Sequence, residues 1–153
     1  MNTPEAVQAV PENDALQVLQ AMKGVIRFGT GKSAQITRPA VGKTGTTSDF
    51  KDAWFIGATP QRATAVWVGY ENPARPMRTQ YLGGPVYGGT IPALVWRDYM
   101  TEALRGQPRE DWDPPADVPS IPVSVDPRTG QRVPPGCKYA KVIVWAEREA
   151  PLQ

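Results

Sequence analysis

The run Val41-Gly42-Lys43-Thr44-Gly45-Thr46-Thr47 continues directly into Ser48-Asp49-Phe50-Lys51-Asp52-Ala53-Trp54-Phe55-Ile56-Gly57, and this stretch decides the fold. It holds two segments of strand character, and a third segment rich in β-forming residues follows at 63–70. The polar links between them, residues 47–51 and 59–62, are too short for a helical crossover. The pattern therefore predicts an antiparallel meander of strands over 39–46, 53–58 and 63–70. Residues 53–58 are apolar on both faces, which is typical of a buried central strand.

Two helices are expected to cover this sheet. The first is predicted over residues 13–28, with Asn13 as an N-cap candidate. Its apolar residues recur at three- and four-residue steps: Leu16, Leu19, Met22, Val25 and Ile26. A second helix is predicted over residues 90–104, with Thr90 as its cap and an apolar side formed by Trp96, Tyr99, Met100, Ala103 and Leu104. The fold class that follows is α+β, an antiparallel sheet segment packed against helices.

The composition divides the chain into a body and a tail. The 17 prolines and 14 glycines concentrate after residue 83 and again over residues 108–135. This predicts a body of residues 1–106 and a proline-rich tail of residues 107–153. Two short strands, 121–125 and 139–145, are expected to pair in the tail around a turn at 126–130.

Several classes of site are excluded by composition. The chain has no histidine and one cysteine, Cys137, so it cannot supply a histidine base, a Ser-His-Asp triad, or a histidine or multi-thiolate metal site. We expect no metal and no cofactor. The net charge of +2 gives no reason to expect nucleic acid as a partner. The sequence also lacks a hydrophobic run that would predict a signal peptide or membrane span.

Short motifs occur in a characteristic order around Lys43-Thr44-Gly45. Lys-Thr-Gly is a signature of penicillin-binding proteins and serine β-lactamases. It is flanked here by Phe28-Gly29-Thr30-Gly31, Arg38-Pro39-Ala40, Asp52-Ala53-Trp54-Phe55-Ile56-Gly57 and Val66-Trp67-Val68-Gly69-Tyr70. The series resembles the C-terminal half of the transpeptidase domain of class A, bifunctional penicillin-binding proteins. The resemblance runs from about Leu16 to Leu104, and more loosely from Asp126 to Cys137.

The resemblance implies a part of a serine-type D-alanyl-D-alanine transpeptidase, which cross-links peptidoglycan through an acyl-enzyme and is the target of β-lactams. Lys43 would supply positive charge and help to manage protons beside the nucleophile. The hydroxyls of Thr44 and Thr46 would bind the carboxylate of the substrate, and the N–H of Thr46 would be one of two oxyanion-hole donors. Gly45, without a Cβ, would let the peptidoglycan stem peptide or a β-lactam approach the strand edge closely.

The family's nucleophile is not expected in this chain. The family uses a Ser-x-x-Lys at a helix start and a Ser-x-Asn, and no Ser-x-Asn occurs here. Ser48-Asp49-Phe50-Lys51 fits the first pattern literally, but it lies in a hairpin link where no helix aligns the two side chains. We therefore expect the chain to be inactive alone and to need the missing N-terminal half of the domain. The expected location is the periplasmic or extracytoplasmic face of a bacterial membrane, with any anchor outside this segment.

Other functions fit the sequence less well. A non-catalytic module that binds a peptide or partner protein through the open strand edge is the main alternative. The runs Gly31-Lys32-Ser33 and Gly42-Lys43-Thr44 resemble the end of a phosphate-binding loop, but the glycine that must precede each by five residues is absent. A carbohydrate platform could be formed by the aromatic residues Trp54, Phe55, Trp67 and Trp96. Their places in predicted strands and a helix favour packing in the core instead.

Overall fold

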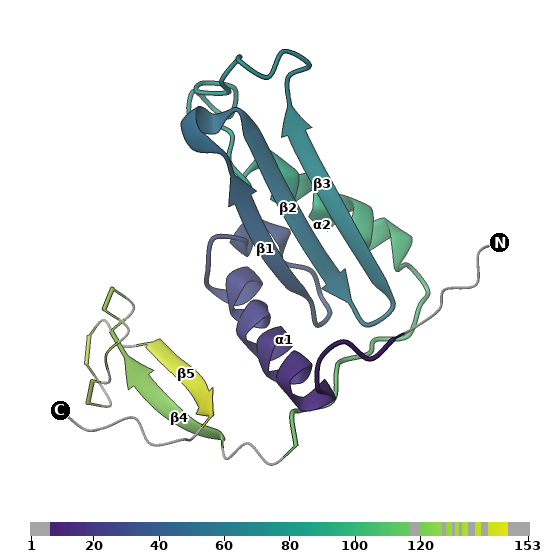
Figure 1. Ribbon diagram of the computed structural model, residues 1–153, viewed down its shortest axis with the longest axis vertical. Helices are drawn as coiled ribbons and strands as arrows, with labels where there is room; N and C mark the ends of the chain where they lie inside the picture. The colour runs from purple at the N-terminus through teal and green to yellow at the C-terminus, as the bar shows by residue number, and fades with distance from the viewer. Residues whose placement is uncertain are drawn as a thin grey trace. The chain divides into compact units, whose positions relative to one another are not determined.

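The computed structural model describes residues 7–116, 120–126, 128, 129, 131, 133, 134, 137, 138 and 141–146. These belong to two compact units, Met1–Pro114 and Pro115–Gln153 (Figure 1). The chain therefore divides close to the start of its proline-rich part. The assignment of residues 1–106 to the transpeptidase-like body and of 107–153 to the tail stays a prediction.

The first unit contains the predicted three-stranded meander. Strands β1 (Val41–Thr46), β2 (Asp52–Thr59) and β3 (Arg62–Gly69) pair antiparallel in the order β1-β2-β3. The register places Thr44 opposite Phe55, and Phe55 opposite Val66. A 3-10 turn, η2 (Ser48–Phe50), forms the first link. Because both outer strands pair on one side only within the described residues, the sheet has two open edges.

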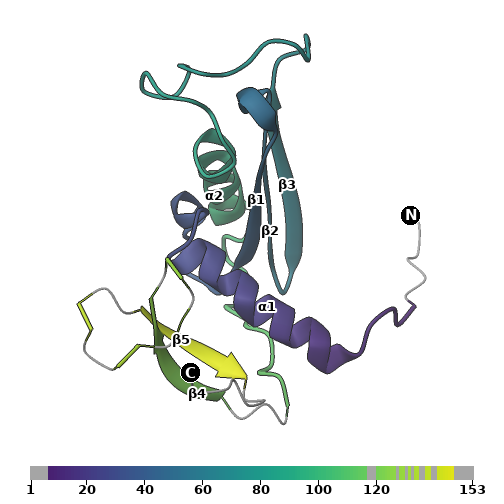
Figure 2. The same cartoon turned by 60° about the vertical axis from the view of Figure 1, so that its left-hand side comes forward.

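Helix α2 (Ile91–Ala103) packs on one face of this sheet, which Figure 2 shows nearly edge-on. The ring of Trp96 meets that of Phe55 edge-to-face at 5.3 Å, and both side chains are fully buried. The indole Nε1 also donates to the carbonyl of Gly57 at 3.3 Å. A Cβ at Gly57 would lie 2.8 Å from the Trp96 ring, so glycine permits this approach. Helix α1 (Glu12–Arg27) and the 3-10 turn η1 (Lys32–Ala34) complete the core through Ile26 and Ala34.

The other face of the sheet is open within the described residues. Trp54 is 41% exposed, Ile56 is 51% exposed and Trp67 is 46% exposed. The prediction that residues 53–58 form the central strand is correct, but the prediction that both of its faces are buried is wrong here. Burial alternates along β2 because the helices among the described residues pack on one face of the sheet.

The start of α1 differs from prediction, whereas that of α2 lies where it was predicted. Helix α1 begins at Glu12 behind Pro11, and the Oδ1 of Asn13 is buried without a hydrogen-bond partner in the described residues. Thr90 is the N-cap residue of α2, as predicted, but its side chain makes no capping bond. Its hydroxyl instead donates to the carbonyl of Tyr87 and accepts from the N–H of the same residue. Tyr99, expected on the apolar side of α2, is 46% exposed, whereas its predicted neighbours Trp96, Met100 and Leu104 are buried.

In the second unit, β4 (Ser120–Val125) and β5 (Lys141–Ala146) pair antiparallel, which confirms the predicted hairpin. Arg128 donates to both carboxylate oxygens of Asp126, at 3.2 and 3.0 Å, inside the turn. These hydrogen bonds lower the pKa of Asp126 below its usual value. Across the described part of the whole chain, no helix has the length and apolarity needed to cross a bilayer.

Candidate functional site

The edge of β1 is the candidate site, and the hydrogen-bond pattern of the strand decides which of its backbone groups are open. The N–H of Thr47 donates to the carbonyl of Asp52 at 3.0 Å, across the end of the β1–β2 ladder. Hydrogen-bonded and non-bonded pairs alternate in an antiparallel ladder. Counting back from Thr47 in steps of two, the odd-numbered residues of β1 bond to β2. The N–H and C=O groups of Thr44 and Thr46 therefore point to the outer edge.

The side chain of Lys43 is consistent with this pattern. Its Nζ donates to the carbonyl oxygen of Thr44 at 2.7 Å, so this carbonyl is accessible from outside the ladder. Lys43 is exposed and stands opposite Ile56, on the face that α2 leaves open. The ammonium group thus lies at the strand edge, where the resemblance requires positive charge.

The hydroxyls of Thr44 and Thr46 lie on the opposite, inner face, because these residues stand across from the buried Phe55 and Ala53. The Oγ1 of Thr44 lies 2.7 Å from the Oγ1 of Thr30 in the loop after α1. A pair of hydroxyls that shares one proton still has one O–H free to donate. Thr44 is thus fixed in orientation while the pair keeps a donor for an anion.

Thr46 is held by the loop that leads into α2. The N–H of Gly88 donates to the Oγ1 of Thr46 at 3.1 Å, which leaves the hydroxyl proton of Thr46 free to donate. A Cβ on Gly88 would collide with the carbonyl oxygen of Trp54 and would lie 2.8 Å from the oxygen of Gly45. A Cβ on Gly89 would collide with the carbonyl oxygen of Thr30. Gly88 therefore lets this loop lie directly on the backbone of β1 and β2, and Gly89 lets it lie on the backbone of the loop after α1.

Thr30, Gly88 and Gly89 were not identified as site residues from the sequence. Thr30 stands in one of the motifs that carry the resemblance, and a glycine doublet directly before a helix is more than a helix start requires. These were the features of the sequence that could have pointed to the three residues. Neither specified a contact with β1, because the loop and the strand are distant in sequence.

The link after β1 explains the geometry of Ser48 and Lys51. Asp49 and Phe50, between them, have positive φ values of 64° and 56°. Two left-handed residues in succession are incompatible with an α-helix, so Ser48 and Lys51 do not lie on successive turns of one. Arg78 fixes the link through two hydrogen bonds to one oxygen of Asp49, at 2.9 and 2.7 Å.

Lys43, Thr44, Gly45 and Thr46 are thus assembled on one strand edge, as expected from the sequence. Among the residues that the structure describes, no group of three or more acidic, cysteine or histidine side chains is placed to hold a metal ion. The chemistry this edge supports consists of main-chain pairing, hydroxyl donation and a positive charge. Their specific roles toward a substrate stay predictions.

Comparison with known proteins identifies relatives of this segment. The chain is 44% identical over 105 residues to penicillin-binding protein 1A of Neisseria lactamica, a match that covers 67% of this chain and 12% of that protein. It is 32% identical over 148 residues to penicillin-binding protein 1A of Pseudomonas aeruginosa, covering 95% of this chain and 17% of the relative. The chain thus spans less than a fifth of the length of these relatives. No protein-family profile matches it.

Solved structures agree with the sequence relatives. The penicillin-binding protein PonA1 of Mycobacterium tuberculosis, solved in complex with penicillin V, matches with a TM-score of 0.64 and 33% identity. That match covers 71% of this chain and 30% of the PonA1 chain. Penicillin-binding protein 1A of Haemophilus influenzae matches over 100% of this chain and 23% of its own, with a TM-score of 0.65 and 23% identity. At that identity, the second match supports the fold alone.

Proposed function

We propose that this chain, which belongs to the class A penicillin-binding proteins, supplies the Lys-Thr-Gly wall of a D-alanyl-D-alanine transpeptidase site. The observation that carries the proposal is the hydrogen-bond pattern of β1. The outward N–H of Thr46 is available to a ligand, and Lys43 and two threonine hydroxyls surround it.

In this proposal the peptidoglycan stem peptide docks along the outer edge of β1 as an additional strand. The open N–H and C=O groups of Thr44 and Thr46 pair with its backbone. The hydroxyls of both threonines donate to its terminal carboxylate. The absence of a side chain at Gly45 leaves room for close approach of the ligand.

The N–H of Thr46 is then one donor of the oxyanion hole. A single donor of this kind is worth roughly 2.7–4 kcal/mol of transition-state stabilisation. Donation by a backbone N–H needs no reorganisation, because the ladder with β2 fixes its direction. The second donor in the family is the N–H of the nucleophile itself, which this chain does not supply.

The partner that supplies the nucleophile is the preceding half of the transpeptidase domain. The open apolar face formed by Trp54, Ile56 and Trp67 supports this assignment, because large exposed apolar patches are unusual on isolated soluble domains. Assembly would cover these three side chains and bring the attacking serine to the β1 edge. The assembled site would act outside the cytoplasm, where peptidoglycan is cross-linked, and would be acylated by β-lactams.

The test is labelling by a fluorescent penicillin. We expect no covalent label on this chain alone, and label on the serine of the added N-terminal half when the two are mixed. Replacing Thr46→Pro removes the N–H and should lower the labelling rate by about a hundredfold or more. The matched Thr46→Val variant keeps the N–H and should retain most of the oxyanion stabilisation. Covalent labelling of the chain alone would refute the split site.

A second candidate function uses the same open surface without catalysis. The exposed Trp54, Ile56 and Trp67 would bind a partner protein, with β1 as an accessory edge. This function requires that the mixture of the two halves remain unlabelled while they still associate. Association without acylation would therefore favour the non-catalytic module.

A further inference from the structure

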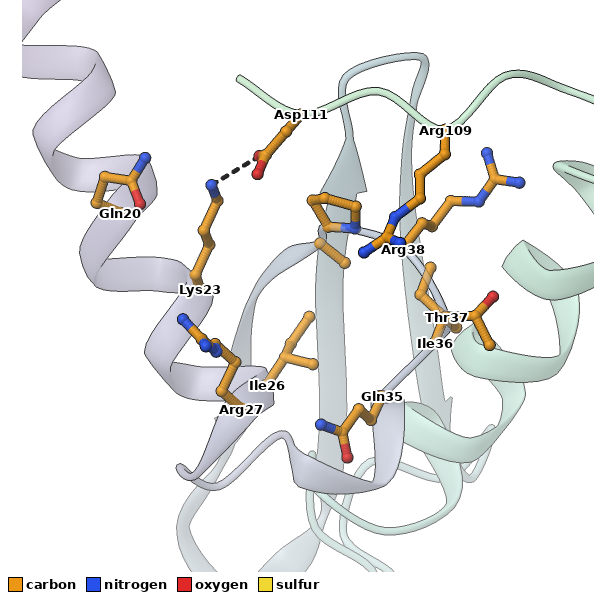
Figure 3. Close-up of a pocket in the computed structure, with 12 residues that line it drawn as sticks. Gln20, Lys23, Ile26, Arg27, Gln35, Ile36, Thr37, Arg38, Arg109 and Asp111 are labelled. Atoms are coloured by element: carbon orange, nitrogen blue, oxygen red, sulfur yellow. Dashed lines mark ion pairs between the residues drawn. The ribbon is translucent and has the colours of Figure 1, made fainter. Parts of the chain in front are cut away.

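A cavity of about 390 Å³ lies in the first unit, and it shares no residue with the run Lys43–Thr46. Three segments form its walls: the C-terminal half of α1, residues 35–40 and residues 109–111, which have no regular secondary structure (Figure 3). The proposed transpeptidase chemistry makes no use of it.

The lining carries four positive charges and one negative charge. Lys23 pairs with the carboxylate of Asp111 at 2.6 Å and lies 5.7 Å from the ring centroid of Trp112. Arg38 donates to main-chain carbonyls beyond α2, among them that of Pro108 at 3.1 Å. These two cations are therefore occupied within the chain.

The other two cations, Arg27 and Arg109, have no hydrogen-bond acceptor or carboxylate partner among the residues that the structure describes. Both are exposed at the cavity. Figure 3 shows Arg27 on α1 and Arg109 descending from the segment on the opposite side. A guanidinium group offers only donors, so a ligand that satisfies this pair must bring acceptors and negative charge.

The remaining lining selects among anions. Ile26 is 3% exposed and Ala40 is 7% exposed, which gives the cavity an apolar floor, while Gln20 and Gln35 bring amide groups to its walls. The residues from α1 belong to the end of a helix where the dipole is negative, so no helix N-terminus is available to hold a phosphate. Amides beside an apolar floor suit a peptide that carries carboxylates.

The chain itself provides a precedent for this recognition. Residues 109–113 have no regular secondary structure, and one of them, Asp111, already presents its carboxylate to Lys23 at the cavity. We propose that the cavity binds a short, extended acidic peptide, whose carboxylates pair with Arg27 and Arg109. The peptide would use the same mode of contact as the chain's own segment.

The experiment titrates the full chain with the capped tripeptide Glu-Pro-Glu, followed by calorimetry and by the NMR signals of the arginine Nε–H groups. We expect saturable binding that shifts the signals of Arg27 and Arg109. The uncharged peptide Gln-Pro-Gln should bind at least about tenfold more weakly, because charge-assisted hydrogen bonds are lost. The double variant Arg27→Gln/Arg109→Gln should weaken Glu-Pro-Glu binding by a similar factor.

The control is Arg97→Gln/Arg105→Gln, which removes the same charge from exposed residues that pair with Asp98 and Glu102. Equal weakening by control and cavity variants would overturn the proposal, since only net charge would then matter. Inorganic phosphate that binds as tightly as the peptide would overturn it too. Thr37→Glu, which keeps both arginines and adds a carboxylate at the cavity, should also abolish binding; unchanged affinity would contradict the site.

Discussion

Replacing Gly88→Ala should destabilise the first unit by about 2–4 kcal/mol. The new Cβ would collide with the oxygen of Trp54 and lie 2.8 and 2.9 Å from the oxygen and nitrogen of Gly45. All three atoms belong to the backbone of the paired strands β1 and β2, so no side-chain rotation relieves the clash. Overpacking costs about 1–3 kcal/mol. Displacing the loop also breaks the 3.1 Å bond from the Gly88 N–H to Thr46, which contributes about 1 kcal/mol.

Equilibrium urea unfolding, followed by tryptophan fluorescence, measures the loss of stability in the Gly88→Ala variant. The shift in the urea midpoint, multiplied by the slope of free energy against urea concentration that the two proteins share, gives the free energy of unfolding that is lost. The matched control is Gly84→Ala in the same loop. There a Cβ would lie 3.4 Å from the oxygen of Tyr81, an ordinary contact, and φ is not positive. Gly88→Ala and Gly84→Ala variants of equal stability would refute the close packing of the loop on β1.

Two further predictions concern the core and the tail. Phe55→Ala should lower the free energy of unfolding by about 3–5 kcal/mol, because Phe55 is fully buried against Trp96. Ile56→Ala, on the open face, should lower it by less than about 1 kcal/mol. Equal urea midpoints for the two variants would contradict the assigned faces. The carboxyl of Asp126 should titrate below pH 3.8 by NMR, and Arg128→Gln should raise its pKa toward that value. Because the pKa of Asp126 is lowered in the folded state, the stability that its ionised carboxylate contributes is present above the unfolded pKa and is lost as pH falls through the folded pKa. If Arg128→Gln left the pKa of Asp126 unchanged, Arg128 would be ruled out as the cause of the shift.

The strand order could be predicted from local features. The links 47–51 and 59–62 admit little except an antiparallel connection, and the structure has the order β1-β2-β3. The burial of the sheet could not be predicted in the same way. Trp54 and Ile56 are apolar enough for a covered face, and whether a face is covered depends on what else packs there.

The helix starts show a second limit. Asn13 and Thr90 are both of the type that caps helices, but neither side chain makes a capping bond. Pro11 provides the observed start of α1, and the Thr90 hydroxyl bonds to the preceding turn at Tyr87. Capping preference is worth about 1 kcal/mol, so a local turn or the tertiary position of a helix can override it.

The candidate site was predictable as a set of residues but not as a geometry. The Lys43–Thr46 run is visible in the sequence, whereas its edge-facing amides depend on the pairing with β2. The anchors Thr30, Gly88 and Gly89 required the folded chain. Thr30 and Gly88 meet β1 from other segments of the chain, and Gly89 meets Thr30. The cationic cavity could not be predicted from the sequence either, since its arginines come from three separate segments.

The alternating pairing of β1 makes the site more sensitive to chain length than to residue type. The amides that face outward do so because the turn η2 joins Thr47 to Asp52 with a fixed number of residues. Adding or removing one residue in that turn would either create a bulge or exchange the inward and outward sets. Natural variation in this segment should therefore exclude single insertions and deletions.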